Sequence, residues 1–475
     1  MFASTTLGRV IAVLGQIGIG WLLTPADFGV WALALSMSTA VMSLRNGGTT
    51  QILIQRGPQF GSEAAFFLRY SLLFNVFAAS ILVGLSTPYL LTRSTVGIAL
   101  LGIAIAVPLA TPAMLYRAKL TIDHRFGALA GINFGSAALW QVSVFTLACL
   151  GFGAVSFACA PILQAAFETL AGRLSAGKLP RESSARPRAD YVALFRQSSW
   201  VMLSAAVLSL GTTGDYFAVG MLTDMATVGI YYFAFQTVVT LTMPIYSGLE
   251  SVLPTMLVKL GDDPPRQVAA LARAMRTMVI AALPLVMTFA LAVPFVIHLL
   301  WYGKWDSAAR PTQILSACVP AWLILHATRA FLEARGYWRL RFGLLALNGV
   351  GGITAAAIGT FFGSVTNITV VVSTYYVSLG LGLVLALHRA GMTLGDVTGI
   401  VGKPAVLNCA ALAMSLALRY GLFPEAGDSL AAVLFVLLSA IGNAAMFKPV
   451  WMDLLGGLAG AVRARTGKAK AVEAI

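Results

Sequence analysis

The chain has 475 residues, of which 58% are apolar and only 11% are charged, and its mean hydropathy is +0.84. Soluble proteins usually carry about 25% charged residues, so this chain has too few to cover a water-facing surface. Its apolar residues recur in blocks of about 20, the length that a helix needs to cross a bilayer. This pattern excludes a soluble enzyme, a nucleic-acid-binding protein and an outer-membrane barrel, whose strands would alternate over about 10 residues.

The apolar blocks predict about 14 membrane-spanning helices joined by short loops. The longest loop, 175–198, is polar and basic and separates six spans from eight. No basic segment precedes the first block, so we expect that block to be an uncleaved signal anchor. The predicted spans are 4–23, 28–44, 66–87, 95–116, 128–150, 154–174, 199–222, 228–249, 277–300, 312–331, 341–362, 366–388, 404–421 and 429–447.

Lys and Arg residues give the orientation of these spans. With the N-terminus inside, the inside segments hold 27 of the 32 basic residues and the outside loops hold four, while Arg9 lies within span 1. Cytoplasmic loops of membrane proteins are enriched in Lys and Arg, which also explains the net charge of +14. The sequence therefore predicts a multi-pass membrane protein with both termini cytoplasmic.

An internal repeat with an offset of 200 residues relates spans 1–2 to spans 7–8. The segment GWLLTPADFGVWALA from Gly20 aligns without gaps to GMLTDMATVGIYYFA from Gly220. Chance similarity between helices rich in Gly, Ala and Leu is the alternative, and the matching short turns TPAD and TDMAT argue against it. Both segments start inside, so the repeats are parallel. The identical pairs are Gly20 and Gly220, Leu22 and Leu222, Ala26 and Ala226, Gly29 and Gly229, and Ala34 and Ala234.

Three segments resemble a known family. The segment LLTPADFGVWALALSMSTAVMSLRNGGTTQILIQRG is similar to the span 1–2 signature of bacterial polysaccharide and oligosaccharide flippases. The segments PAMLYRAKLTIDHRFGALAGIN and GDYFAVGMLTDMATVGIYYFAFQ extend this similarity. These flippases, which include O-antigen and exopolysaccharide translocases, belong to the multidrug/oligosaccharidyl-lipid/polysaccharide exporter superfamily. The resemblance implies two six-helix lobes around a central cavity, with two extra helices.

We therefore expect an all-α polytopic membrane protein with two six-helix lobes related by the repeat. The predicted segments are an N-terminal lobe over 1–175, a basic cytoplasmic linker over 176–198, a C-terminal lobe over 199–390, extra helices 13 and 14 over 391–447, and a basic cytoplasmic tail over 448–475.

Ionisable residues at membrane depth are candidates for function because their burial is costly. Arg9 and Glu168 lie at similar depth, so they either form an ion pair, or Arg9 faces the cavity and meets an anionic head group, or Arg9 snorkels to the interface. Asp215 in span 7 aligns with Gly15 in the repeat. Asp215 is either a proton- or cation-linked switch or a carboxylate satisfied by hydrogen bonds. We assign Asp215 and Glu168 as candidate coupling residues.

The resemblance implies a substrate that carries a pyrophosphate, so basic residues near the cytoplasmic mouth are candidate substrate-binding groups. Gln16, a neutral polar residue at membrane depth, either lines a sugar cavity or hydrogen-bonds to a neighbouring helix. The alternative for Arg329 is snorkelling into the inside loop. A cluster at the end of span 9, with Trp301 and Trp305, predicts an aromatic interface belt rather than a platform for sugar stacking. The candidate substrate-binding residues are Arg9, Gln16, Arg45, Arg56, His326 and Arg329.

The resemblance implies a flippase that moves a lipid-linked oligosaccharide for exopolysaccharide, capsule or O-antigen assembly by alternating access. The alternatives are a lipid II flippase, a cation-coupled drug antiporter, which would place acids deep in spans 1–5, and a membrane glycan polymerase, which would need paired carboxylates in a long outer loop. We expect no catalytic activity, cofactor, metal or nucleic-acid partner. The expected partners are a polyprenyl-pyrophosphate-linked oligosaccharide and membrane lipid, with a polysaccharide polymerase and chain-length machinery as further candidates.

Overall fold

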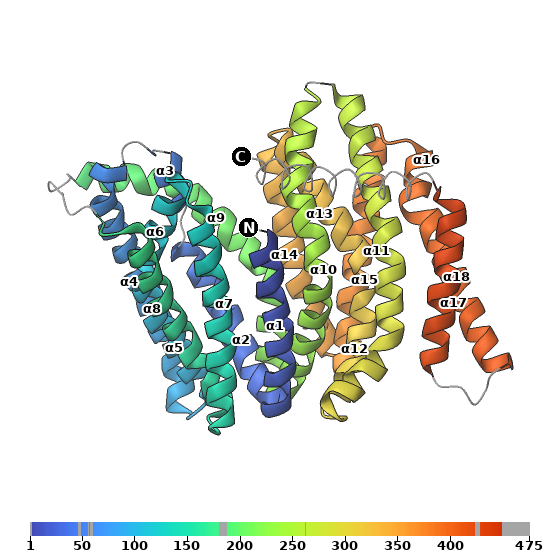
Figure 1. Ribbon diagram of the computed structural model, residues 1–475, viewed down its shortest axis with the longest axis horizontal. Helices are drawn as coiled ribbons and strands as arrows, with labels where there is room; N and C mark the ends of the chain where they lie inside the picture. Colours follow the sequence, from blue (N-terminus) through green and yellow to red (C-terminus); the bar gives the residue numbers. More distant parts are fainter. Residues whose placement is uncertain are drawn as a thin grey trace, which may run out of the picture. The chain divides into compact units, whose positions relative to one another are not determined.

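The computed structural model describes residues 2–45, 49–55, 57, 60–179, 188–261, 263–422 and 428–448, and these residues form a helical protein (Figure 1). The helices are α1 (Phe2–Leu22), α2 (Pro25–Arg45), α3 (Thr49–Gln55), α4 (Phe60–Leu91), α5 (Thr95–Leu109), α6 (Thr111–Ile122), α7 (Phe126–Cys149), α8 (Ser156–Ala176), α9 (Arg188–Leu222), α10 (Met225–Lys259), α11 (Pro264–Trp301), α12 (Asp306–Ser316), α13 (Val319–Ala334), α14 (Trp338–Thr360), α15 (Val365–Arg389), α16 (Leu394–Val397), α17 (Lys403–Leu422) and α18 (Asp428–Met446).

Ten helices in the described part of the chain are long and apolar enough to cross a membrane. The number rises to 12 if each of two bent helix pairs counts as one span. Two shorter apolar stretches, Val13–Leu22 in α1 and Val433–Asn443 in α18, lie outside this count. The prediction of an all-α polytopic fold is therefore confirmed, whereas the predicted count of 14 spans is not.

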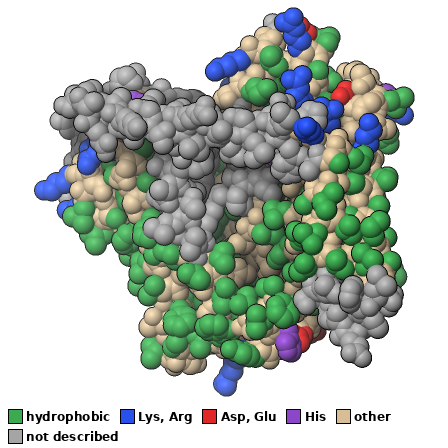
Figure 2. Space-filling model, turned by 45° about the vertical axis from the view of Figure 1, so that its right-hand side comes forward, with side chains coloured by type: hydrophobic (Ala, Val, Ile, Leu, Met, Phe, Trp, Pro, Cys, Tyr) green, Lys and Arg blue, Asp and Glu red, His purple; other side chains and the backbone are tan. Residues whose placement is uncertain are grey.

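Large apolar side chains cover the sides of the helices. Leu73 and Phe77 of α4 are 63% and 59% exposed, and Val350 of α14 is 61% exposed. On the face shown in Figure 2, hydrophobic side chains spread along the helices, whereas Lys and Arg side chains gather near their ends. A continuous apolar surface of this kind indicates contact with lipid rather than water.

The described helices form two compact units, and several helices continue from one unit into the other. Unit 1 comprises residues 1–240, 298–311 and 339–375, and unit 2 comprises residues 241–297, 312–338 and 376–475. Within unit 1, α2 packs against α4, α5 and α9, while α8 packs against α5, α6 and α7. In unit 2, α17 packs against α18. The lobe, linker and tail boundaries drawn from the sequence stay a prediction.

The two repeats begin their second helices with the same cap, but with the residues exchanged. At the start of α2, the Thr24 N–H and hydroxyl donate to Oδ2 of Asp27 at 2.8 and 2.7 Å, and the Asp27 N–H donates to the Thr24 hydroxyl. At the start of α10, the Thr227 N–H and hydroxyl donate to Asp224 at 3.0 and 2.7 Å. Each arrangement satisfies backbone groups that a helix N-terminus leaves unpaired. The acid and the hydroxyl thus trade places at an offset of 200 residues.

Glycines let these two helices cross at backbone distance inside unit 1. A side chain added at Gly29 would overlap the carbonyl oxygen of Met225, and one added at Gly229 would overlap the carbonyl oxygen of Pro25. The two contacts are reciprocal, because residue 25 aligns with residue 225 in the repeat. The helix starts of the two repeats therefore meet around a local two-fold axis, as the internal repeat requires.

A second shared feature is a sharp bend in the fourth predicted span of each half. The pair α5 and α6 is bent by 48°, and the pair α12 and α13 is bent by 49°. Both α6 and α13 begin with a proline in their first turn, at Pro112 and Pro320. Proline cannot donate a backbone hydrogen bond, so it favours a new helix start at these positions.

The exchanged caps predict that the two cap arrangements are interchangeable. We expect the free energy of unfolding of the double variant Thr24→Asp/Asp27→Thr to lie within about 0.5 kcal/mol of the wild-type value. Asp27→Ala alone should lower the free energy of unfolding by about 1 kcal/mol, because it removes the cap. Thermal unfolding of the purified protein in detergent measures both. A double variant as unstable as Asp27→Ala would contradict the equivalence of the two turns.

Candidate functional site

Glu168 lies at the centre of a polar cluster in unit 1. Its Oε1 accepts a hydrogen bond from the Ser136 hydroxyl at 2.6 Å and lies 3.1 Å from Nη2 of Arg117. The Gln164 amide in turn donates to the Ser136 hydroxyl at 2.8 Å. The Glu168 side chain is 14% exposed and the Arg117 side chain is 34% exposed. Helices α6 and α8 therefore supply the two members of a partly buried ion pair, and α7 supplies a hydroxyl that donates to its carboxylate.

Arg45 adds a second guanidinium to this cluster. It is the last residue of α2, and the charges of both Glu168 and Arg117 act on it. Its Nε is buried and has no hydrogen-bond partner among the described residues. The carboxylate of Glu168 thus pairs with Arg117 and also acts electrostatically on Arg45, and these three side chains together carry one more positive than negative charge. We call Arg45, Arg117 and Glu168 the arginine cluster.

Two predicted residues, Arg45 and Glu168, belong to the arginine cluster, whereas the side chains of two others are not described. Arg9 lies in α1, but its side chain lies outside the described residues, as does Arg56. The predicted ion pair between Arg9 and Glu168 is therefore not tested. The structure gives Glu168 a different partner, Arg117, which the sequence analysis assigned to an inside segment and did not consider as a site residue.

The other two basic candidates, His326 and Arg329, lie one turn apart on α13 in unit 2. The His326 ring stacks on the Tyr246 ring with centroids 4.7 Å apart and planes 6° apart. The Tyr246 hydroxyl lies 2.6 Å from the Thr242 hydroxyl. Arg329 is partly buried. Their assignment to the substrate stays a proposal.

Gln16, the remaining predicted residue, lines a pocket of about 170 Å³ in unit 1. We call it the aromatic–amide pocket. The helices α1, α2, α7, α8 and α10 supply its walls. Its lining residues are Gln16, Ile19, Phe28, Trp31, Trp140, Gln141, Phe157, Tyr232, Gln236 and Thr240.

Stacked rings form the buried wall of this pocket. The Trp31 ring is stacked on Phe157 at a centroid distance of 5.2 Å and tilted against Trp140, also at 5.2 Å. The Gln236 amide donates to the Tyr232 hydroxyl at 3.2 Å. Trp31, Phe157 and Tyr232 are buried, whereas Trp140 and the amide side chains are partly exposed. The sequence alone does not reveal this pocket, because its aromatic residues lie inside predicted spans, where they resemble core residues.

Asp215 is buried in unit 1 with a satisfied carboxylate. It is 5% exposed, and its Oδ2 accepts from the Tyr231 hydroxyl at 2.8 Å while its Oδ1 accepts from the Tyr216 N–H at 3.0 Å. The rings of Tyr216, Tyr231 and Phe235 pack around it. The first repeat has no equivalent, because Gly15 stands at the position of Asp215. A side chain at Gly15 would overlap the amide of Gln141, so the missing side chain makes room for a residue that lines the pocket.

Tryptophans tie the end of α11 to the end of α1 within unit 1. Nε1 of Trp301 donates to the Ile17 carbonyl at 3.1 Å, and Nε1 of Trp305 donates to the Gly20 carbonyl at 3.0 Å. The Lys304 ammonium donates to the Trp21 carbonyl at 2.9 Å. The Gly20 and Trp21 acceptors lie in the last turn of α1, where carbonyls lack partners within the helix.

The predicted aromatic interface belt is therefore wrong for Trp301 and Trp305. Trp301 is 7% exposed and Trp305 is fully buried, with its ring stacked on Phe233 and packed edge-on against Phe28. Periodicity placed these residues at a helix end, but it carried no information on the α1 carbonyls that they reach. The neighbouring Tyr302 is 86% exposed.

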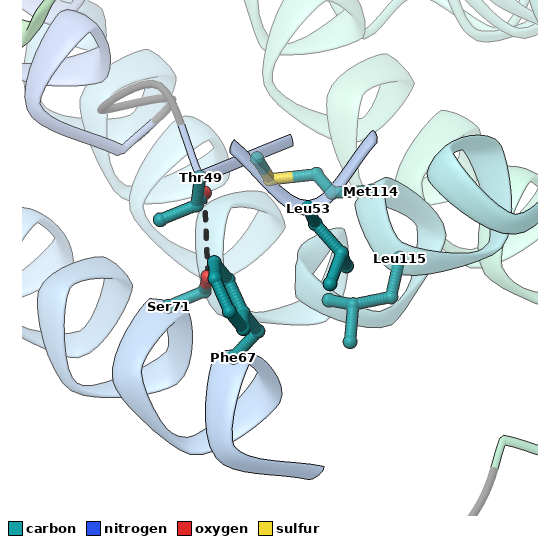
Figure 3. A pocket seen from close by; sticks show the side chains of 6 residues that line it. All are labelled: Thr49, Leu53, Phe67, Ser71, Met114 and Leu115. Atoms are coloured by element: carbon teal, nitrogen blue, oxygen red, sulfur yellow. Dashed lines mark hydrogen bonds between the residues drawn. The ribbon is translucent and has the colours of Figure 1, made fainter. Parts of the chain in front are cut away.

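A much smaller pocket lies between α3, α4 and α6 (Figure 3). Thr49 and Ser71 face one another across it with their hydroxyls 3.5 Å apart, while Leu53, Phe67 and Leu115 close its other sides. Its volume of about 10 Å³ admits about one water molecule. This pocket suits a structural water rather than a substrate.

Comparison with solved structures identifies the class of protein to which this fold belongs. A lipid II flippase, MurJ, in an inward closed conformation superposes with a TM-score of 0.72 at 10% identity, covering 94% of this chain and 98% of that chain. A multidrug resistance MATE family transporter of the MOP superfamily, in an inward-facing conformation, gives a TM-score of 0.62 at 14% identity, covering 82% and 96%. The fold is thus one of membrane transporters and flippases, rather than of catalytic enzymes.

The sequence identifies the family within this class. Residues 20–310, more than half of the chain, match the family described as polysaccharide biosynthesis protein, and the chain belongs to that family. No curated protein matches the sequence. The predicted resemblance is thus confirmed for the family by the sequence match and for the fold by the solved transporters.

The arginine cluster predicts unequal effects of removing its two kinds of charge. We expect Glu168→Gln to destabilise the protein more than Arg117→Gln, because it leaves two guanidinium groups without a carboxylate. Arg117 is one-third exposed, so its own loss should cost only about 1 kcal/mol. Adding Arg45→Gln should restore part of the stability lost in Glu168→Gln.

Thermal unfolding in detergent measures these effects. The exposed pair of Arg266 and Asp263, 3.1 Å apart, is the matched control, and Arg266→Gln should change stability by less than about 0.5 kcal/mol. Equal and additive losses at Glu168, Arg117 and Arg45 would show that the three residues do not interact.

Proposed function

We propose that the protein is an inner-membrane flippase that moves a lipid-linked oligosaccharide, destined for exopolysaccharide, capsule or O-antigen, from the cytoplasmic to the periplasmic leaflet by alternating access. The family and the fold support a transporter of polysaccharide synthesis. The surplus positive charge of the arginine cluster carries the proposal, because it suits the pyrophosphate that joins such a glycan to its lipid. Guanidinium groups bind phosphate oxygens in planar, charge-assisted pairs.

The proposed path of the pyrophosphate begins at Arg45 and includes the other predicted candidates. Arg9, Arg56, His326 and Arg329 are proposed to guide the anion, and Gln16 is proposed to meet the glycan. The bias of 27 basic residues inside against four outside supports cytoplasmic termini. A polysaccharide polymerase and chain-length machinery are proposed to receive the glycan afterwards.

The lipid II flippase alternative shares the pyrophosphate, so the arginine cluster supports it equally. The cation-coupled antiporter fits less well, because a surplus of guanidinium groups repels a cationic drug. That alternative favours acids deep in the early helices. The structure places one buried acid there, Glu63, in the first turn of α4 rather than near the middle of the helix.

Transport by proteoliposomes tests the proposal directly. We expect purified protein to move a fluorescent trisaccharide linked to undecaprenyl pyrophosphate across the bilayer, as measured by chemical quenching of the exposed label. Arg45→Ala should slow this transport about tenfold, the effect of losing one hydrogen bond to a charged group. Arg45→Lys should restore part of the rate, since it keeps the charge.

Arg266→Ala, which removes an exposed guanidinium from α11, is the matched control and should transport at the wild-type rate. Accumulation of ethidium without movement of the glycolipid would support the drug antiporter. Preferential movement of lipid II would support the lipid II flippase, and lengthening of the glycan would support the polymerase.

We propose further that Asp215 couples transport to a proton or cation. Its carboxylate lies between α9 and a tyrosine of α10, so a change in its charge would alter how these helices hold together. Asp215→Asn keeps the shape and one acceptor oxygen but cannot titrate. We expect normal membrane levels with strongly reduced glycan transport.

Tyr231→Phe separates the charge of Asp215 from its hydrogen bond, because it removes the donor and leaves the carboxylate. We expect partial transport from that variant. Wild-type transport by Asp215→Asn, with loss only in Asp215→Ala, would show that the residue has a packing role alone.

A further inference from the structure

We propose that the aromatic–amide pocket binds a single uncharged sugar ring of the transported glycan. This inference rests on the proposed function and names the class of sugar that this site accepts. A cavity of about 150 Å³ holds a benzene ring. The pocket of about 170 Å³ is therefore on the scale of one ring rather than of a folded oligosaccharide.

The buried wall of the pocket suits the apolar face of a pyranose. Trp31 and Phe157 stack on one another with planes only 17° apart, and Trp140 leans over them from α7 at 52° to Trp31. The C–H groups on one face of a sugar ring pack on such aromatic surfaces, while the hydroxyls point outward from the ring edge. Binding pockets commonly combine an aromatic wall with a few placed polar groups in this way.

The polar groups at the pocket are of a kind that pairs with sugar hydroxyls. Each glutamine amide offers both donors and an acceptor, as a hydroxyl does. Gln236 gives one of its two amide hydrogens to Tyr232. Oε1 of Gln141 is buried and has no partner among the described residues. This oxygen packs against Gly15 out of reach of solvent, so sugar hydroxyls are proposed to meet the partly exposed amides of Gln16 and Gln236.

The lining favours an uncharged ring. None of the ten lining residues that the structure describes is Asp, Glu, Lys, Arg or His. A carboxylate or ammonium group that lost its water there would meet no opposite charge among them, which costs several kcal/mol. The pocket thus favours a neutral hexose over a uronate or a cationic drug. The positive charge needed for the pyrophosphate lies instead in the arginine cluster.

The repeat gives this pocket to one half only. Gly15 leaves room for the Gln141 amide, whereas the equivalent Asp215 fills its position with a carboxylate bonded to Tyr231. Trp31, the stacked ring of the pocket, aligns with that same Tyr231. The pocket therefore stands where the second half has a closed carboxylate site, and Gly15 is a positioning residue for Gln141.

Free sugars test the pocket without the lipid. We expect methyl glucoside to change the tryptophan fluorescence of the full-length protein in nanodiscs saturably, and sodium glucuronate to bind at least about tenfold more weakly, a difference of about 1.4 kcal/mol. The variants Trp140→Phe and Gln236→Ala should each weaken methyl glucoside binding about fivefold or more. Gln197→Ala, which removes an exposed amide of α9, and Tyr302→Phe are matched controls and should bind as the wild type does.

A charge exchange makes the test sharper. Gln236→Arg adds a guanidinium to the pocket lining and should make glucuronate bind more tightly than methyl glucoside. Binding of glucuronate as tight as that of methyl glucoside in the wild type would overturn the proposal. So would methyl glucoside binding that survives both Trp140→Phe and Gln236→Ala, or the absence of any saturable response to methyl glucoside.

The same variants distinguish a failed pocket from a failed function. In this assay, citronellyl pyrophosphate and its glucosyl derivative each compete with a fluorescent prenyl pyrophosphate for binding to the protein. We expect the glucose to add about fivefold affinity, and Gln236→Ala to remove this gain without changing the binding of citronellyl pyrophosphate itself. Binding of the pyrophosphate with no gain from glucose overturns the sugar pocket and leaves the proposed function standing. Methyl glucoside binding without any pyrophosphate binding overturns the proposed function and supports the pocket.

Discussion

The close crossing of α2 and α10 is the contact on which the rest of unit 1 depends. Two helices meet at backbone distance only where neither carries a side chain, and Gly29 and Gly229 provide that gap for each other. The crossing brings Phe28 of one repeat beside Tyr232 and Phe233 of the other. Trp305 packs against Phe28 and Phe233 at the same place. The pocket wall and the buried tryptophan contacts thus follow from one glycine pair.

The repeated backbone carries different chemistry in its two halves. The Thr24–Asp27 cap becomes Asp224–Thr227 with its function unchanged, because either residue order pairs a hydroxyl and an amide with a carboxylate. Gly15 and Trp31, by contrast, align with Asp215 and Tyr231, and here the chemistry changes. One half has an open pocket of rings and amides, and the other has a buried carboxylate held by a tyrosine hydroxyl. The repeats therefore share a backbone frame, and a few differences in sequence give its two halves different side-chain chemistry.

The charged residues of the arginine cluster and the stacked rings of the aromatic–amide pocket are separate sets of residues in unit 1. The arginine cluster has guanidinium groups and one carboxylate, while the aromatic–amide pocket has a lining without charge. A glycolipid presents the same division, since its pyrophosphate is anionic and a neutral sugar is not. Guanidinium groups are costly to bury without partners, whereas amides and rings are cheap to bury near a ligand that can pair with them. The proposed separate sites for the two parts of one substrate agree with this difference.

The sequence by itself determined the class of the fold and its internal repeat. Membrane helices leave a direct record, because each needs about 20 apolar residues, and the turns TPAD and TDMAT recorded the duplication. Gln16 was predicted to bind substrate because it is a polar residue at membrane depth, and the sequence alone shows this property. Only the tertiary structure decided which polar and aromatic residues meet. Glu168 reaches Arg117, and Trp305 reaches the Gly20 carbonyl rather than a membrane interface. The reason is physical: hydropathy measures how deep a residue lies along its helix, but helix rotation and crossing decide which neighbour it faces.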